Sequence, residues 1–200
     1  FYLLPPLAKR KQSHEVGPLL SGDGYRCFEY ILPPQKRVQA SIRIFEEKTK
    51  RNQSLLIITP SHIASQKLAA ALQTNNIPVS LFPPEPTLKA QKEFYTCARK
   101  NNVPTVYIGT RGALITPLHS IGGIVIDEPW LPGHKEDQQV RWWSCIPAQA
   151  LAQARDIPLY VVSSLPWPET QLLSPVKQYA PPTPLGTFRV MPPRALAEMV

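Results

Sequence analysis

Short apolar runs alternate with longer amphipathic windows along most of the chain. The runs are rich in β-branched residues and, apart from Ser80, have no polar position in their interior, which is typical of strands covered on both faces by helices. They span 55–59, 79–82, 105–109, 123–127 and 159–163. We therefore expect a parallel sheet built from these five segments, with helices on both sides.

Helix signals lie between the runs, in the windows 35–51, 61–75, 87–101 and 137–155. Ser61 and Thr87 are suitable N-cap residues at the start of two of them. Three windows end in similar junctions, 75–78, 101–104 and 155–158, in which an Asn or Asp is followed two residues later by Pro. Asn and Asp tolerate the left-handed conformation at a helix end, and Pro stops the helix before the next strand.

Strands that alternate with helices in this way imply βαβ crossovers. The sequence thus predicts an α/β fold with three layers around a parallel sheet. Residues 1–34 are expected to form a linker plus a first strand, and 187–191 a further strand. The 24 prolines cluster between the periodic segments and mark the loops.

Composition narrows the class of protein. A length of 200 residues corresponds to about one domain, and 43% hydrophobic residues are enough for a core.

No apolar run is long enough to span a membrane, and no targeting segment is visible, so the chain is interpreted as an excised piece. Three separated cysteines and four histidines without zinc-site spacing predict reduced thiols and no metal site. A formal net charge of +8 indicates an anionic partner.

Candidate chemistry is expected beyond the carboxyl ends of the strands, where open α/β sheets bind ligands. The turn at 22–27 offers Gly22, Gly24 and Arg26, but neither the Lys nor the Ser/Thr of a phosphate loop. It is either a vestigial nucleotide-binding loop or a simple surface turn. The strand at 123–127 ends in Asp127 and Glu128, a Walker B-like pattern that can hold Mg²⁺ or cap a helix.

Other segments suit nucleic acid. Thr110 and Arg111 follow a strand end at Gly109 and could contact phosphate, or form an ordinary turn with a solvated Arg. A second segment combines positive charge with an aromatic ring, as the binding of single strands requires, in Lys135, Arg141 and Trp142. Alternatively, these rings serve the fold, because at least one of the adjacent tryptophans 142 and 143 is expected in the core. The hydroxyls in 163–166 form a further, weaker candidate.

In this order, the segments resemble the first lobe of the PriA family of bacterial replication-restart helicases, over residues 17–175. The stretch 109–113 with Pro117 is similar to the family's Gly-Thr-Arg motif, Asp127-Glu128 matches half of its Asp-Glu-Glu-His motif, and 163–166 corresponds weakly to Ser-Ala-Thr-Pro. Lys135 and Arg141-Trp142 stand where the family has Lys-Gln and Arg-Tyr. The resemblance implies a RecA-like lobe of the P-loop NTPase type with degenerate motifs.

The resemblance also implies a function. It indicates a cytoplasmic, nucleoid-associated bacterial DNA-binding protein of primosome assembly, with forked or single-stranded DNA and primosome or replication proteins as partners. Residues 1–16 would be a basic linker from an upstream domain, and 176–200 a connection towards a second lobe. Without the phosphate-loop Lys and Ser/Thr, ATP hydrolysis and helicase activity are not expected, so Asp127 and Glu128 would be vestigial.

Two alternatives stay open. In one, the chain is an active ATP-dependent 3′–5′ DNA helicase that binds ATP and Mg²⁺ through an atypical phosphate loop, with Arg26 in place of the Lys. In the other, it is an α/β module that binds a phosphorylated ligand or a protein partner, and the likeness to helicases is accidental.

Overall fold

The computed structural model describes residues 25–84, 87–118, 120–135, 142–165, 168–173 and 176–178. Within them, strands pair in parallel to form one seven-stranded sheet, in the order β3-β4-β2-β5-β6-β1-β7. The strands are β1 (Cys27–Ile31), β2 (Ser54–Ile58), β3 (Val79–Leu81), β4 (Val106–Gly109), β5 (Ile121–Asp127), β6 (Leu159–Ser163) and β7 (Val176–Gln178). The predicted parallel sheet is confirmed.

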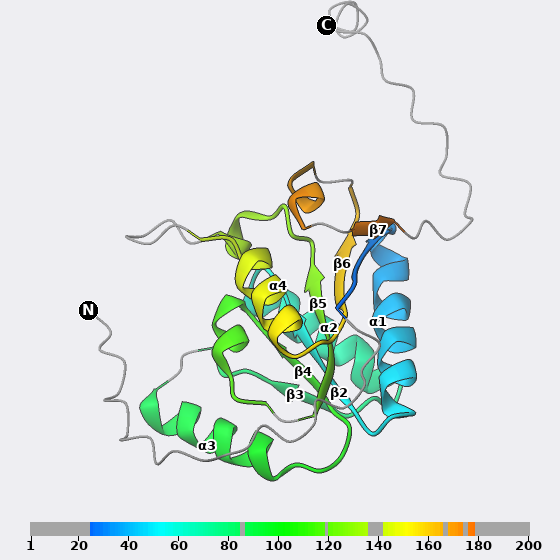
Figure 1. The fold of residues 1–200 in the computed structure, drawn as a ribbon. Helices are drawn as coiled ribbons and strands as arrows, with labels where there is room; N and C mark the ends of the chain where they lie inside the picture. Colours follow the sequence, from blue (N-terminus) through cyan, green and yellow to red (C-terminus); the bar gives the residue numbers. More distant parts are fainter. Residues whose placement is uncertain are drawn as a thin grey trace, which may run out of the picture.

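Helices cover both faces of this sheet (Figure 1). One face carries α1 (Pro34–Thr49) and α2 (His62–Thr74), and the other carries α3 (Leu88–Lys100), α4 (Cys145–Ala154) and the short 3-10 helix η1 (Arg111–Ile115). Two further 3-10 helices are η2 (Pro132–His134) and η3 (Pro168–Leu172). The three-layer architecture predicted from the sequence is therefore confirmed.

The two layers of helices create two cores, one on each side of the sheet. Successive residues of β2 alternate between them: Leu55 and Ile57 face α1 and α2, whereas Leu56 and Ile58 face the opposite layer. All four side chains are fully or almost fully buried. A strand buried on both faces has no polar positions to alternate with, which is why these strands read as continuous apolar runs.

The predicted helix boundaries are largely confirmed. The hydroxyl oxygens of Ser61 and Thr87 accept hydrogen bonds from the backbone N–H groups of Ala64 and Ala90, each at 3.2 Å. Asn76 and Asp156 adopt positive φ angles of 56° and 53°, as their junctions predict. The middle junction differs, because Asn101 is extended and Asn102 does not adopt a positive φ angle.

The window predicted as a helix over 137–155 is helical only from Cys145 onward among the described residues. Trp143 instead forms an antiparallel bridge with Lys135. The Trp143 indole donates to the Pro129 carbonyl at 3.0 Å, which holds this segment against the loop after β5. Here, tertiary hydrogen bonds outweigh helical periodicity. The strand predicted at 187–191 lies outside the described residues.

Cys27 and Cys145 are free and buried, whereas the free Cys97 is exposed. None of the helices in the described ranges combines the length and apolarity that a membrane crossing requires.

Candidate functional site at the carboxyl ends of the strands

The carboxyl ends of β5 and β6 meet the first turn of α1. From β1, the chain runs through α1 on one face of the sheet to β2, whereas α4 connects β5 to β6 across the other face. Adjacent strands whose connections leave on opposite faces define a topological switch point, where α/β proteins bind ligands. β2 and β5 are adjacent strands of this kind, because α2 follows β2 on the α1 face and α4 follows β5 on the other face, so a switch point lies between their carboxyl ends.

An ion-pair cluster occupies this position. Arg37, in the first turn of α1, places Nη1 at 2.7 Å from Asp127 Oδ1 and at 3.0 Å from Glu128 Oε1. The side chains are 22%, 16% and 6% exposed, respectively. One guanidinium group therefore faces both carboxylates that end β5, in surroundings where solvent screens the charges only in part.

The second oxygen of Glu128 is also engaged. Oε2 accepts hydrogen bonds from the Trp130 indole N–H at 2.6 Å, the Ser164 backbone N–H at 3.1 Å and the Ser163 hydroxyl at 3.4 Å. Glu128 has a φ of 54°, a left-handed conformation that costs free energy in a non-glycine residue. These hydrogen bonds hold its carboxylate in one orientation, so its oxygens serve the fold rather than an external ligand.

Burial changes the ionisation of two groups here. It raises the pKa of Asp127 to about 6, although the neighbouring Arg37 lowers that value, and Glu128 adds a further increase. Burial also lowers the pKa of His134 to about 4. His134 Nε2 lies 2.7 Å from the Asp127 carbonyl oxygen, an acceptor, so Nε2 carries the proton in the neutral ring. The buried Nδ1 then faces no hydrogen-bond donor among the described residues.

The loop between β1 and α1 is short and rich in proline. It consists of Leu32 and Pro33, and α1 begins at Pro34. Phosphate binding at a helix N-terminus relies on free backbone N–H groups, and neither proline has one. Further along the chain, the backbone N–H of Lys36 donates a hydrogen bond to the Pro33 carbonyl at 2.9 Å. This loop therefore lacks the donors of a phosphate cradle.

Arg26 of the predicted nucleotide-binding loop is not at this edge. Arg26 directly precedes β1, and its carbonyl accepts a hydrogen bond from the N–H of Leu159, the first residue of β6. It thus lies at the amino end of the sheet, about 17 Å of strand away from the Arg37 cluster. The expectation that Arg26 lies beyond the carboxyl ends is wrong, because β1 starts after it. Gly22 and Gly24 lie outside the described residues.

Arg111 has an intrachain role. Its Nη1 donates to the Gly133 carbonyl at 3.2 Å and to the Lys135 carbonyl at 3.4 Å, so the guanidinium holds the η2 loop against η1. Gly133 packs so closely on Pro60 that a Cβ would overlap the Pro60 carbonyl oxygen. Thr110, next to Arg111, is partly exposed.

The other candidates contact protein as well. Lys135 Nζ lies 3.5 Å from Glu169 Oε1, and both side chains are 42% exposed. Trp142 is partly buried and packs against the apolar core on the α4 side, as the sequence leads one to expect for at least one tryptophan of the pair. Arg141 lies outside the described residues.

The residues at the site do not fit a Mg²⁺–nucleotide complex. Mg²⁺ requires carboxylate oxygens or water in its coordination shell, but here a guanidinium lies against both carboxylates. The Arg37 group already supplies the positive charge that the metal would bring. In the described part of the chain, no group of three or more His, Cys, Asp or Glu side chains is arranged to hold a metal ion.

Comparison with solved structures places the fold. The S. cerevisiae Dbp5 C-terminal domain, in complex with Gle1 and IP6, aligns with a TM-score of 0.51 at 11% identity, over 78% of this chain and 88% of that one. A second structure of the C-terminal domain of the DEAD-box protein Dbp5 gives 0.55 at 9% identity, with the same coverage. The Pyrococcus furiosus Hef helicase domain gives 0.54 at 14% identity, over 80% of this chain and 36% of that one.

The chain has the fold of a RecA-like helicase domain. It spans about a third of the length of the Hef structure, so it corresponds to one part of that protein. No family model matches the sequence, and no curated protein matches it either. Arg37 is the residue of this candidate site that the sequence analysis does not single out. Its only local signal is a basic residue in the first turn of a helix, where an acidic one is favoured.

Proposed function

We propose that this helicase-like domain binds DNA without hydrolysing ATP, as part of a replication-restart protein of the PriA family. The observation that carries the proposal is the contact of Arg37 with both Asp127 and Glu128. The family assignment rests on the order of the motifs along the chain, from 109–113 through Asp127-Glu128 to 163–166.

Loss of ATP hydrolysis follows from electrostatics. Phosphoryl transfer depends on Mg²⁺ held by an acidic residue and on donors that cradle the phosphates. A metal ion at Asp127 would have to displace a guanidinium that is held at 2.7 Å within the same chain. The loop of Leu32 and Pro33 offers no lysine and no free N–H to compensate. An active helicase that uses Arg26 loses support as well, since Arg26 lies at the amino end of the sheet.

DNA binding is supported by charge. The chain has a formal net charge of +8, and its stretch 34–51 carries six basic and two acidic residues, namely Lys36, Arg37, Arg43, Lys48, Lys50 and Arg51 against Glu46 and Glu47. Four of the six, Lys36, Arg43, Lys50 and Arg51, are exposed. Basic side chains gathered on one element attract the phosphate backbone over a Debye length. Thr110, Arg111, Lys135, Arg141 and Trp142 remain proposed as further DNA contacts, and primosome proteins as partners.

Two measurements on the purified chain test the proposal. Titration calorimetry with Mg²⁺–ATP should give no binding heat, with or without forked DNA. Fluorescence anisotropy with forked DNA should give an affinity that falls steeply with salt, because each neutralised phosphate releases a counterion. Asp127→Asn serves as the control in the calorimetry.

Two results would contradict the proposal. Binding of Mg²⁺–ATP that disappears in Asp127→Asn would restore the active helicase. DNA binding that is absent, or that does not depend on salt, would favour the module for a phosphorylated ligand or a protein partner.

A further inference from the structure

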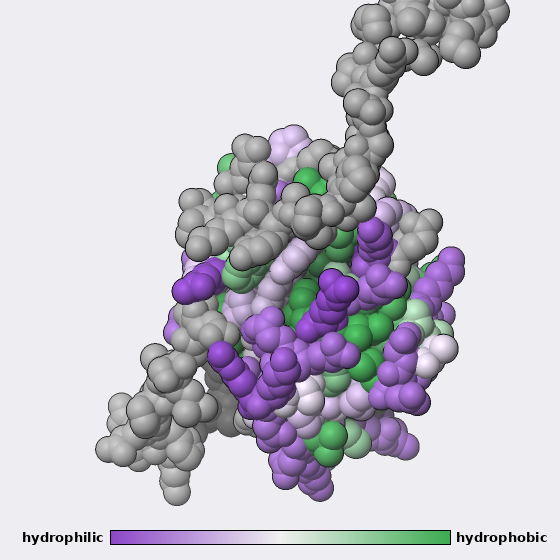
Figure 2. Space-filling view, turned by 90° about the vertical axis from the view of Figure 1, so that its right-hand side faces the viewer, coloured by the Kyte–Doolittle hydropathy of each residue, from purple (hydrophilic) through white to green (hydrophobic). Residues whose placement is uncertain are grey.

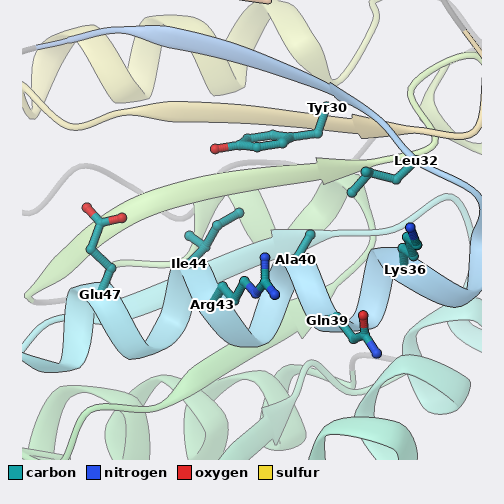
Figure 3. A pocket seen from close by; sticks show the side chains of 8 residues that line it. All are labelled: Tyr30, Leu32, Lys36, Gln39, Ala40, Arg43, Ile44 and Glu47. Carbon is teal, nitrogen blue, oxygen red and sulfur yellow. The ribbon is translucent and has the colours of Figure 1, made fainter. Parts of the chain in front are cut away.

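A cavity of about 340 Å³ opens between β1 and α1 (Figure 3). Its volume is within the range of sites that hold small organic groups. Neither Arg37, Asp127 nor Glu128 lines it. The cavity is therefore a separate feature of the surface.

The cavity exists because α1 leaves part of the sheet uncovered. On the α1 side, Tyr160 of β6 is 4% exposed, whereas Phe28 and Tyr30 of the neighbouring β1 are only partly buried. In the space-filling view of this side of the molecule, apolar surface lies between hydrophilic side chains (Figure 2). The floor of the cavity thus includes an aromatic ring that no helix covers completely.

The ring of Tyr30 is held in place by aromatic neighbours. Its centroid lies 6.3 Å from that of Tyr160, and the Phe28 ring stacks on the same Tyr160 ring, with the centroids 5.4 Å apart and an interplanar angle of 17°. The buried Lys48 places Nζ 5.7 Å from the Tyr160 centroid. A ring fixed in this way is preorganised, so a ligand that stacks on it loses little free energy in ordering the protein.

The opposite wall combines apolar and cationic side chains. Ile44 of α1 is 5% exposed and faces the same gap as Tyr30 (Figure 3). Lys36 and Arg43, two helical turns apart, are exposed and line the cavity with the polar Gln39 between them. The one carboxylate in the lining, Glu47, lies 3.1 Å from Lys48 Nζ, which offsets its charge. The net charge of the wall is therefore positive.

We propose that this cavity, bounded by Tyr30, Ile44, Lys36 and Arg43, binds one nucleotide of a single-stranded nucleic acid. The base stacks on Tyr30 and packs against Ile44, and the adjacent backbone phosphates contact the cationic side chains of Lys36 and Arg43. An aromatic ring beside basic residues is the combination by which proteins hold single strands without reading their sequence. The inference rests on the proposed DNA binding and specifies where a single strand contacts the domain.

Fluorescence anisotropy of a short fluorescent oligo(dT) strand tests this inference. Tyr30→Ala should weaken binding about ten-fold, because it removes one stacked base, whereas Tyr30→Phe should retain nearly the full affinity. Arg43→Glu should weaken binding and reduce the steepness of its salt dependence. Lys92→Glu on α3, across the sheet, is the matched charge control and should have a small effect. Thermal unfolding of each variant verifies that the fold is intact.

The outcomes separate this inference from the proposed function. If wild-type protein binds the strand and both Tyr30→Ala and Arg43→Glu retain its affinity, the cavity is not the site, and DNA binding lies elsewhere on the domain. An equal loss in Lys92→Glu and Arg43→Glu would indicate unspecific attraction to a basic protein and would overturn the inference. If free thymidine monophosphate displaces the fluorescent strand as effectively as the unlabelled strand does, the cavity binds a mononucleotide instead of a single strand. Wild-type protein that binds no DNA contradicts both proposals.

Discussion

Arg37 and Asp127 are 90 residues apart in the sequence, yet Arg37 Nη1 lies 2.7 Å from Asp127 Oδ1. The first belongs to the helix after β1, and the second ends β5. In a nucleotide-binding α/β domain, phosphates and their metal ion lie between the corresponding segments. In this chain, the Arg37 side chain supplies the positive charge between these segments.

Arg37→Ala should destabilise the fold by about 3 kcal/mol, because it leaves two carboxylates without their cation in a partly buried site. Urea unfolding of wild type and variant measures the difference. Arg37→Lys should recover only part of the loss, since one ammonium group cannot reproduce the geometry of a guanidinium against two carboxylates. Adding Asp127→Asn and Glu128→Gln to Arg37→Ala should restore stability. Equal stability of Arg37→Ala and wild type would show that the contact contributes nothing.

His134 should make the fold less stable in mild acid. Because its pKa falls to about 4 in the folded protein, it binds a proton more readily once unfolded. The stability linked to this ring is complete above the unfolded pKa of about 6.5 and is lost as the pH falls towards 4. Asp127 acts in the opposite direction: its pKa is raised to about 6, so its contribution is largest below about 4 and is lost as the pH rises through 6.

Replacement of His134 isolates its share of this dependence. When the pH is lowered from about 7 to about 5, the free energy of unfolding should fall by roughly 2 kcal/mol less in His134→Gln than in wild type. Urea unfolding at the two pH values gives this difference, with His62→Gln as the control at a histidine that is not fully buried. The same pH dependence in His134→Gln and wild type would contradict the assignment.

Gly133→Ala should displace the η2 loop, because its Cβ would overlap the Pro60 carbonyl oxygen. We expect a loss of about 3 kcal/mol in thermal or urea unfolding, since backbone atoms on both sides must move. Gly112→Ala is the matched control: its Cβ would meet only the Phe82 ring at 3.9 Å, an ordinary contact. A neutral Gly133→Ala would mean that the loop adjusts without cost.

Cys97 should be the thiol that reacts in the native protein. It is exposed on α3, whereas Cys27 and Cys145 are buried, and burial raises the pKa of Cys27 to about 12 and that of Cys145 well above its usual value. The thiolate is the reactive form, so the buried pair should react only on unfolding. A colorimetric thiol assay should detect one fast-reacting thiol in wild type and none in Cys97→Ser. Fast reaction of a second thiol would contradict the burial of Cys27 or Cys145.

The sequence by itself determined the alternation of strands and helices, because the signals for it are local. Continuous apolar runs, the caps at Ser61 and Thr87, and the junctions at Asn76 and Asp156 depend on neighbours within a few residues. Such signals fix backbone conformation and the faces to be buried. The three-layer fold could therefore be predicted before any tertiary contact was known.

Only the tertiary structure decided which residues meet at the carboxyl ends of the strands. The order β3-β4-β2-β5-β6-β1-β7 brings Arg37 to Asp127 and places Arg26 at the opposite edge. It also leaves Tyr30 beside α1 with an open cavity. Strand order is set by the packing of whole layers across long separations in sequence, and no local pattern around Arg37 encodes its two partners. That is the physical reason why the fold could be read from the sequence and the contacts of Arg37 could not.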